Sequence, residues 1–368
     1  MNLFKKYAKD IKHIVLKNKN SLNLNNISNI DNIIVESPPE HFDYDLSSNV
    51  AMVLSKINNE NPRNLAEKLR TILSNNINDF AKIDIAGPGF LNFKFNKKAW
   101  VSIINSILKS KSKYGSNKIK KKYNVEFVSA NPTGPMHVGH CRGAVFGDVI
   151  SNLLKFNGAK VTKEFYINDY GKQIENFTKS VFLRMREIKF KENFPNDKDL
   201  YHGNYIIDIA KMLFKNSKKI NLNRYEDSFD AIKNKSLDQS LKLIKSDLKS
   251  LGIKHDVFFS ESNMIKKKYV DKIINVLKKN NHVTDGYLSP PKGEETKTWK
   301  KTKRLIFKSS NFGDDSDRAL QKNDGTWTYF ANDIGYHFTK VSKKYDKLIN
   351  VLGADHIGYI KRISAAVT

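Results

Sequence analysis

The sequence predicts an α/β protein built on a parallel sheet. Residues 123–128 alternate as in a buried strand, residues 131–135 have the composition of a turn, and a helix and a second strand follow, up to residue 167. This order of strand, turn, helix and strand is typical of the start of a parallel sheet. We expect the sheet to resume at residues 304–307, 327–330 and 348–352. Residues from about 181 to 300 are rich in Lys, Asn and Ile with helical periodicity, which indicates a helical insertion between the halves of the sheet.

A smaller α/β module is predicted before this sheet. Its clearest part is a hairpin, in which Gly87-Pro88-Gly89 turns the chain between strands at 81–85 and 90–95. A helix begins at Asn96 and leads into a lysine-rich stretch at 109–122, which we interpret as a solvated connector; direct contact with RNA is the alternative. The domain boundary is therefore predicted near residue 115, giving domains 1–115 and 116–368. The remaining elements expected in the first domain are an amphipathic helix at its start, a strand at 32–35, and helices at 47–56 and 62–74.

The helix after residue 135 begins at a motif that suits a nucleotide phosphate. His137 and His140 lie three residues apart in its first turn, where free amide groups and the positive end of the helix dipole favour an anion such as ATP. Gly139 has no side chain, so an adenine or ribose can approach the backbone. Histidines that only cap a helix or pack in a core are the alternative for so short a pattern. The helix is supported by apolar residues at helical spacing: Val138, Val145, Val149, Leu153 and Phe156.

Composition limits the class of protein. The 368 residues suffice for two or three domains, and 39% hydrophobic residues suffice for buried cores. The single cysteine, Cys141, excludes an internal disulfide and a cysteine-clustered zinc site, and we expect no metal-binding residues. No apolar run approaches the roughly 18 residues that cross a bilayer, so we expect a cytoplasmic protein without a membrane partner.

The net charge of +26 indicates attraction to a polyanion such as a nucleic acid. The alternative is a general drift toward lysine in an organism with an AT-rich genome. The sequence has neither the G-x-G-x-x-G fingerprint of dinucleotide-binding folds nor a P-loop, which argues against a dehydrogenase and a P-loop NTPase.

The run from Val125 to Gly147, which contains Glu126-Phe-Val-Ser-Ala-Asn-Pro-Thr-Gly-Pro-Met-His-Val-Gly-His140, resembles the arginyl-tRNA synthetases in their bacterial form. Residues 168–173, 201–205 and 351–356 resemble the same family, and residues 41–49 and 87–92 are similar to its amino-terminal domain. The resemblance implies a Rossmann-like, class I catalytic domain with a helical insertion, after a small α/β domain that contacts tRNA. It also implies ATP-dependent activation of L-arginine to arginyl-adenylate and transfer to tRNA(Arg), with Mg²⁺ accompanying ATP. We expect a monomer.

The resemblance also implies roles for single residues. His137 and His140 would bind ATP and stabilise the transition state, and the other ATP-binding residues would be Gly139, Gly353, Asp355 and His356. Glu126 and Asp333 would grip the guanidinium of arginine, Tyr329 would flank it, and Ser129 and Asn131 would hold its α-amino and carboxylate groups. The secondary candidates are Asn168, Asp169 and Gln173.

Several of these residues have a simpler interpretation. Glu126 can be a buried carboxylate paired with a lysine inside the sheet, since an unpaired buried charge is costly. Asp333 can be the N-cap of a helix that starts at Ile334. Trp327 and Phe330 are expected to be core residues rather than a platform for stacked bases.

The sequence departs from the family pattern in one respect. A lysine loop like Lys-Met-Ser-Lys, the second catalytic signature, does not occur in it, and neither does the helical anticodon-binding domain. We therefore expect a carboxyl-terminally incomplete chain. A truncated or inactive tRNA-binding relative and another H-x-G-H nucleotidyltransferase remain as alternative functions.

Overall fold

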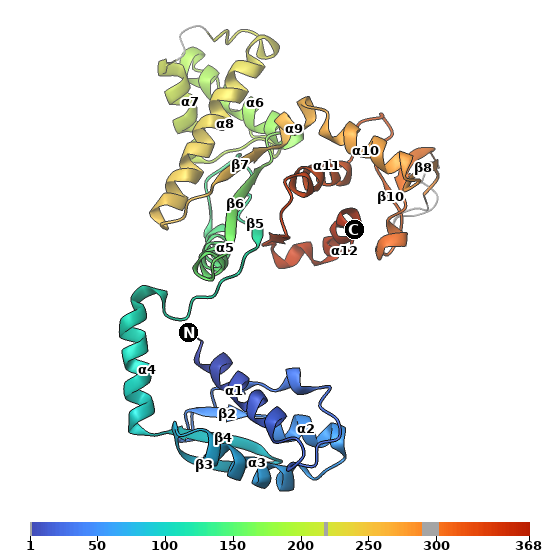
Figure 1. Cartoon of the computed structure of the whole chain (residues 1–368). Coiled ribbons are helices and arrows are strands. Elements are labelled where there is room, and N and C mark those ends of the chain that lie inside the picture. The colour runs from blue at the N-terminus through green and yellow to red at the C-terminus, as the bar shows by residue number, and fades with distance from the viewer. Residues whose placement is uncertain (1, 217–219, 289–301) are drawn as a thin grey trace. The chain divides into compact units, whose positions relative to one another are not determined.

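The computed structural model describes residues 2–216, 220–288 and 302–368. The chain divides into two compact units, Met1–Lys118 and Ile119–Thr368, each with buried hydrophobic clusters of its own (Figure 1).

The first unit is an antiparallel sheet, in the order β1-β2-β4-β3, packed against helices. The predicted hairpin is confirmed, and both Gly87 (φ +52°) and Gly89 (φ +133°) have the left-handed backbone that favours glycine. The helix predicted from Asn96 is also confirmed, with Asn96 as its N-cap. The elements are α1 (Leu3–Lys17), η1 (Ile30–Asn32), β1 (Val35–Glu36), β2 (Leu46–Ser48), α2 (Val50–Asn58), α3 (Pro62–Asn76), β3 (Phe80–Ala86), β4 (Phe90–Phe95), α4 (Lys97–Ser110) and η2 (Lys111–Lys113).

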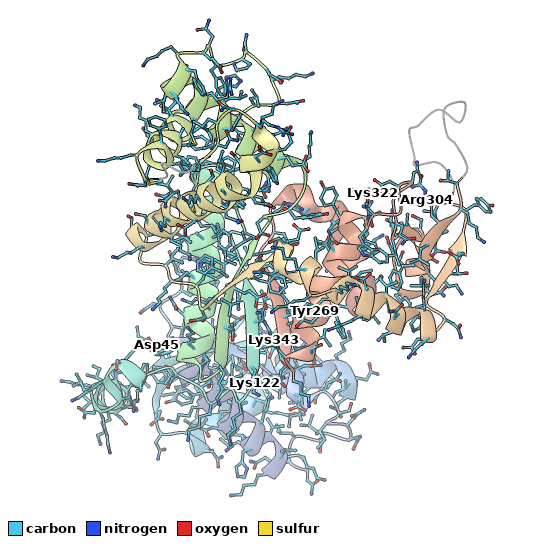
Figure 2. The ribbon with its side chains drawn as sticks, turned by 90° about the horizontal axis from the view of Figure 1, so that it is seen from above. Asp45, Lys122, Tyr269, Arg304, Lys322 and Lys343 are labelled. Atoms are coloured by element: carbon cyan, nitrogen blue, oxygen red, sulfur yellow. The ribbon has the colours of Figure 1, made fainter. Side chains whose placement is uncertain are left out.

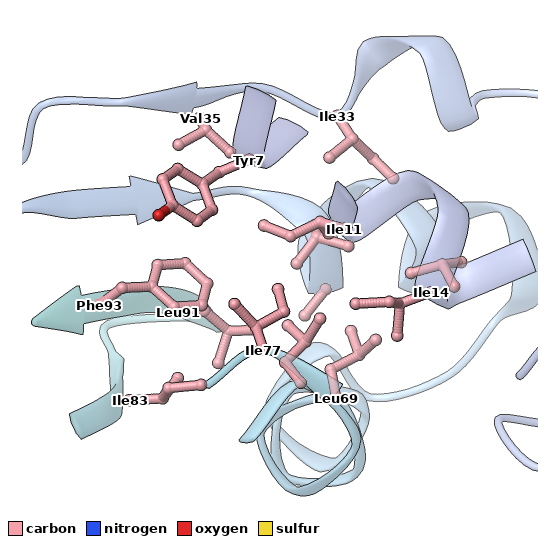
Figure 3. Packing of buried hydrophobic residues seen from close by; sticks show 14 of the residues in the cluster. Tyr7, Ile11, Ile14, Ile33, Val35, Leu69, Ile77, Ile83, Leu91 and Phe93 are labelled. Carbon is pink, nitrogen blue, oxygen red and sulfur yellow. The ribbon is translucent and has the colours of Figure 1, made fainter. Parts of the chain in front are cut away.

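The core of this unit joins α1 and α3 to the sheet. Tyr7 and Ile11 of α1 are buried against Leu69 of α3 and against Leu91 and Phe93 of β4 (Figure 3). The strand predicted at 32–35 is wrong in position, because the chain makes a 3₁₀ turn at residues 30–32 and pairs with β2 only at residues 35–36.

The second unit contains a parallel sheet in the order β11-β5-β6-β7 and a separate antiparallel sheet in the order β10-β9-β8. Helices α6, α7 and α8, which connect β6 to β7 along the chain, pack together as one group (Figure 1). The elements are β5 (Lys122–Glu126), α5 (Val138–Phe156), β6 (Lys160–Ile167), α6 (Lys172–Phe190), α7 (Asn204–Asn216), α8 (Tyr225–Ser250), β7 (Val257–Ser260), α9 (Glu261–Lys266), α10 (Tyr269–Lys279), β8 (Val283–Gly286), β9 (Arg304–Phe307), η3 (Ser309–Phe312), β10 (Arg318–Ala319), α11 (Tyr329–Ser342), β11 (Lys347–Asn350), η4 (Ala354–Tyr359) and α12 (Ile360–Val367).

Three sequence expectations for this unit need correction. The strand at 304–307 exists, but it belongs to the antiparallel sheet. Residues 327–330 are not a strand of the parallel sheet, because Thr328 caps α11 and the helix begins at Tyr329. The segment 181–300 is not one helical insertion, since it contains β7, which pairs in parallel with β6.

Helix α5 packs on the sheet with its small residues. Ala144, Gly147 and Ser151 are its buried positions, whereas the apolar series from Val138 to Phe156 that predicted the helix is exposed, between 43% and 86% by residue. A Cβ on Gly147 would lie 2.2–2.6 Å from side-chain atoms of Phe127, so the glycine permits the close approach of α5 to the end of β5.

None of the helices in the described ranges is long and apolar enough to cross a membrane.

Replacing Gly147 by alanine is expected to destabilise the second unit. The new methyl group would overlap the buried Phe127 ring, and overpacking of this kind costs roughly 1–3 kcal/mol. Gly143→Ala in the same helix is the matched control, because its Cβ would meet nothing within 4 Å and the change should stabilise the helix by roughly 0.5–1 kcal/mol. Thermal unfolding of both variants measures the difference; a Gly147→Ala protein as stable as Gly143→Ala would contradict the packing.

Candidate active site

The predicted site residues follow the carboxyl ends of the parallel strands. The turn after β5 carries Ser129 and Asn131, the segment after β6 carries Asn168, and Gly353 follows β11. In an open parallel sheet this edge is the usual position of a ligand site. Helix α11 brings Tyr329 and Asp333, and a Cβ on Gly171 would lie 3.9 Å from the Tyr329 hydroxyl.

The two histidines form a stacked pair at the start of α5. His137 is the N-cap and His140 is the third residue of the helix, with ring centroids 3.8 Å apart. Nδ1 of His137 accepts from the Gly139 amide at 3.2 Å, and Nδ1 of His140 accepts from the His137 amide at 3.3 Å. Because each Nδ1 is an acceptor, the ring proton is on Nε2 in both residues. The site therefore presents two Nε2–H donors beside the helix N-terminus.

Burial, followed by the charge of His137, lowers the pKa of His140. The ring is thus neutral at pH 7 and donates through Nε2. Gly139 leaves room for this stack, because a Cβ there would lie 3.1 Å from Cε1 and 3.2 Å from Nδ1 of the His137 ring, and the ring would have to give way slightly. Packing against the His137 ring is thus a second reason for glycine at position 139, in addition to the predicted approach of a nucleotide.

Glu126, at the end of β5, has its carboxylate occupied by protein partners. Oε2 accepts from Lys340 Nζ at 2.5 Å and from the Tyr336 hydroxyl at 2.9 Å, and Oε1 accepts from Ser129 Oγ at 3.1 Å. Burial alone would raise the pKa of this carboxyl group, but the Lys340 ammonium lowers it. This pair with Lys340 is the alternative that the sequence analysis gave for Glu126, a buried carboxylate paired with a lysine. Because Lys340 neutralises the charge of Glu126, the pair favours a structural role for this carboxylate, and its role as a guanidinium ligand stays a prediction.

Asp333 is not the N-cap that the sequence left as an alternative. It lies within α11, one turn after the cap Thr328, and accepts a hydrogen bond from the Tyr359 hydroxyl. Burial raises the pKa of Asp333 to about 6, against the effect of Tyr359. Tyr329, the first residue of α11, is 67% exposed and thus accessible to a ligand. Of the two aromatic neighbours, Phe330 is buried and Trp327 packs against the same cluster.

Sequence reasoning missed Glu261. This residue follows β7, is 3% exposed, and accepts from Asn332 Nδ2 of α11 at 3.0 Å and from the Tyr166 hydroxyl. Burial, together with the charges of Asp333 and Asp169, raises the pKa of Glu261 to about 7. The signal was present in the sequence, because Glu261 comes two residues after the apolar run Val257–Phe259, and Glu126 ends another strand.

Two buried carboxylates, Glu261 and Asp333, distinguish this part of the site. Glu261 lies near the charges of Asp333 and Asp169, and Asp333 lies near that of Glu126, while the charge of His356 acts on Asp333 in the opposite sense. A cation bound between them would relieve both the burial and the repulsion. The Asp169 carboxylate fixes the end of β7 and the start of α9. Its Oδ1 accepts from the Ser262 amide at 2.7 Å, and its Oδ2 accepts from the Ser260 hydroxyl at 2.6 Å.

The amide side chains near the sheet edge form a short chain of hydrogen bonds. Asn168 donates to Asn131 Oδ1 at 3.3 Å, and Asn131 donates to Gln173 Oε1 at 3.0 Å. The structure therefore brings two secondary candidates into contact with Asn131. Their amide groups can reorient toward a ligand that carries both an amino group and a carboxylate.

The predicted ATP residues after β11 are only partly described. Gly353 is the N-cap of η4 and His356 is exposed, while the side chain of Asp355 lies outside the described part of the structure. Among the described residues, no group of three or more His, Cys, Asp or Glu side chains could hold a metal ion.

Comparison with known proteins matches both units. Residues 5–95 match the family model for the arginyl-tRNA synthetase N-terminal domain, and residues 103–368 match the model for the catalytic domain of class I (R) tRNA synthetases. The chain is 48% identical over 370 residues to the arginine–tRNA ligase of Pelagibacter ubique and 42% identical to that of a Wolbachia endosymbiont of Brugia malayi. It spans 64% of the length of each relative.

Solved structures agree with the fold. A Campylobacter jejuni protein assigned as an arginyl-tRNA synthetase superposes with a TM-score of 0.62 at 34% identity, covering 72% of this chain and 55% of that one. The arginyl-tRNA synthetase of Plasmodium falciparum superposes with a TM-score of 0.64 over 97% of this chain and 61% of that one; at 21% identity it supports the fold alone.

Replacement of Glu261 by glutamine is expected to raise stability at alkaline pH. The folded-state pKa of about 7 lies above the ordinary value of 4.5, so the native state binds more protons than the unfolded chain between these values, and the carboxylate costs stability as pH rises through that window. At pH 8 we expect Glu261→Gln to raise Tm by roughly 5 °C, with a smaller gain at pH 5. Calorimetry measures both. The control is Glu175→Gln, which replaces an exposed carboxylate. If Glu261→Gln changed Tm equally at both pH values, the charge of Glu261 would not cost stability.

Proposed function

Because this chain belongs to the arginyl-tRNA synthetase family, we propose that it functions as an arginine–tRNA ligase. Its substrates are ATP with Mg²⁺, L-arginine and tRNA(Arg). The domain of residues 1–115 contacts tRNA, and the domain of residues 116–368 carries out the chemistry. The net charge of +26 supports a polyanionic partner.

The observation that carries the proposal is the pair of buried carboxylates, Glu261 and Asp333. A guanidinium is a planar cation with five donors, so two carboxylates on different elements can receive it from two sides. Tyr329, exposed at the start of α11, flanks this position. We assign the guanidinium to Asp333 and Glu261 rather than to Glu126, whose charge Lys340 already neutralises.

The other end of arginine faces the turn after β5. Ser129 and Asn131 hold its α-amino and carboxylate groups, supported by the hydrogen-bond chain from Asn168 to Gln173. This orientation directs the carboxylate toward the start of α5. The phosphates of ATP bind there, on the amide groups of the helix N-terminus and on the Nε2–H donors of His137 and His140. Gly353, Asp355 and His356 border the adenosine, and Gly139 lets it approach α5.

In the first step, a carboxylate oxygen of arginine attacks the α-phosphorus of ATP. The bond between this phosphorus and the bridging oxygen breaks, and pyrophosphate leaves with the electron pair and Mg²⁺. The protein supplies position and hydrogen bonds to the growing charge, so no side chain acts as a nucleophile. In the second step, the 3′-terminal ribose hydroxyl of tRNA attacks the carbonyl carbon of arginyl-adenylate, AMP leaves, and the hydroxyl proton passes to the AMP phosphate.

Arginine-dependent exchange between ATP and pyrophosphate, with and without tRNA(Arg), tests the proposed function. Exchange that requires arginine supports the ligase. Binding of tRNA without exchange, at saturating arginine, would favour an inactive tRNA-binding relative. Exchange with another carboxylic acid in place of arginine would show a different H-x-G-H nucleotidyltransferase.

Asp333→Asn is expected to weaken arginine binding by at least about 30-fold, because one carboxylate of a buried charge cluster is lost. Binding of a nonhydrolysable ATP analogue should change less than about twofold, since the phosphates bind at α5. Wild-type affinity for arginine should rise between pH 5.5 and pH 8, as groups with pKa values of about 6 and about 7 ionise. Isothermal titration calorimetry measures all three, with Asp315→Asn, an exposed carboxylate paired with Lys361, as the control. If the arginine affinity of the wild type did not change with pH, Asp333 and Glu261 would not be arginine ligands.

A further inference from the structure

The turn that follows β5 has a strained backbone. Val128 has φ +70° and Ser129 has φ +44°, so two consecutive non-glycine residues are left-handed. For valine this conformation is a clear outlier, because its branched Cβ meets the backbone. Such a conformation persists only where surrounding contacts enforce it. The strain includes Ser129 and lies two residues before Asn131, and these are the residues proposed to hold the amino-acid end of arginine.

The contacts that enforce the turn lead to Glu126. Ser129 Oγ donates to Glu126 Oε1 at 3.1 Å and accepts from the Tyr166 amide of β6 at 3.0 Å. The other oxygen of Glu126 is fixed by Lys340 Nζ at 2.5 Å and by the Tyr336 hydroxyl at 2.9 Å. The Glu126 carboxylate is thus a bridge, with the strained turn on one side and α11 on the other.

The α11 side of the bridge is rigid. The Lys340 side chain is fully buried and also donates to Asn350 Oδ1 of β11 at 3.2 Å. The Tyr336 hydroxyl donates to Glu164 Oε1 of β6 at 2.8 Å. Lys343, labelled in Figure 2, follows α11, and its Nζ lies 3.9 Å from Glu164 Oε2. These contacts tie α11 to three neighbouring strands. The same helix carries Tyr329 and Asp333 in its first turns.

We propose that Glu126 is a positioning residue: held by Tyr336 and Lys340, it keeps the turn at Val128–Ser129 left-handed and so sets where Ser129 and Asn131 meet the substrate. The inference rests on the proposed function for the identity of the substrate. It gives Glu126 a role different from that of a guanidinium ligand. Arginine would touch both ends of this bridge, at Asp333 and at Ser129, without touching Glu126.

The test replaces the ion pair by apolar residues of similar size, Glu126→Leu with Lys340→Met. Removing the carboxylate alone would leave the buried Lys340 charge unpaired, whereas an apolar replacement of a buried pair is often neutral for stability. The matched control is Asp148→Leu with Lys163→Met, an ion pair at 2.5 Å with 15% and 9% of the side chains exposed, against 12% and 0% for the pair of Glu126 and Lys340.

Binding is measured by calorimetry for arginine and for agmatine, which keeps the guanidinium and lacks the carboxylate. We expect the Glu126→Leu, Lys340→Met protein to lose about tenfold in arginine affinity and less than about twofold in agmatine affinity, because only arginine uses the full contact with Ser129 and Asn131. The control pair should change neither. Equal loss of both ligands would make Glu126 a guanidinium ligand and overturn the proposal.

Addition of Val128→Gly provides the second readout. Glycine adopts a positive φ without steric cost, so it should restore at least about threefold of the arginine affinity lost with the ion pair. A purely structural role of the pair would show no such rescue.

A crystal structure of the Glu126→Leu, Lys340→Met protein tests the positioning role of Glu126 independently of the proposed ligase function. We expect Val128 and Ser129 to leave the left-handed region in that structure. Unchanged positive φ values at both residues would overturn the inference even if arginine binds, and a relaxed turn would support it even if arginine proved to be the wrong substrate.

Discussion

The buried ion pair between Lys340 and Glu126 is the interaction on which the arrangement of the second unit depends. Lysine is a residue type that sequence patterns rarely assign to a core, yet the side chain of Lys340 is fully buried next to β5 and β11. An ammonium group there is stable only with a counter-charge and further hydrogen-bond acceptors, which Glu126 and Asn350 provide. This requirement fixes the rotation of α11 against β5 and β11. The first turns of α11 then point Tyr329 and Asp333 to the carboxyl edge of the sheet.

The same unit contains buried carboxylates of two kinds. Glu126 and Glu164 have lysine, tyrosine or asparagine partners, and they contribute to the fold. Glu261 accepts hydrogen bonds from Asn332 and Tyr166, Asp333 accepts one from Tyr359, and burial raises the pKa of both, although the charge of His356 opposes this at Asp333. A buried carboxylate with a raised pKa costs stability when it ionises, which is why we propose that these two receive a cationic ligand.

The sequence was most informative where short-range chemistry decides the structure. The H-x-G-H helix start, the glycine turn of the first hairpin and the cap at Asn96 depend on neighbours in the chain, and the structure has all three. Residues 327–330 were predicted as a strand because Trp, Thr, Tyr and Phe favour strands, but the Thr328 cap and packing against the antiparallel sheet decided for a helix. The pairing of Glu126 with Lys340 joins residues 214 positions apart, and periodicity contains no information on it.

The proposed sites for ATP and for arginine depend on different elements. The histidines are fixed by local hydrogen bonds within α5, each Nδ1 accepting from an amide two or three residues away, so this half of the site forms wherever the helix forms. The proposed arginine half needs α11, α9 and the turn after β5 to meet, and these segments are far apart in the chain. The turn at Val128–Ser129 precedes α5 in the chain, and both of its residues have a left-handed backbone. The proposed specificity for the amino acid is thus the property of this unit that depends most on its tertiary packing.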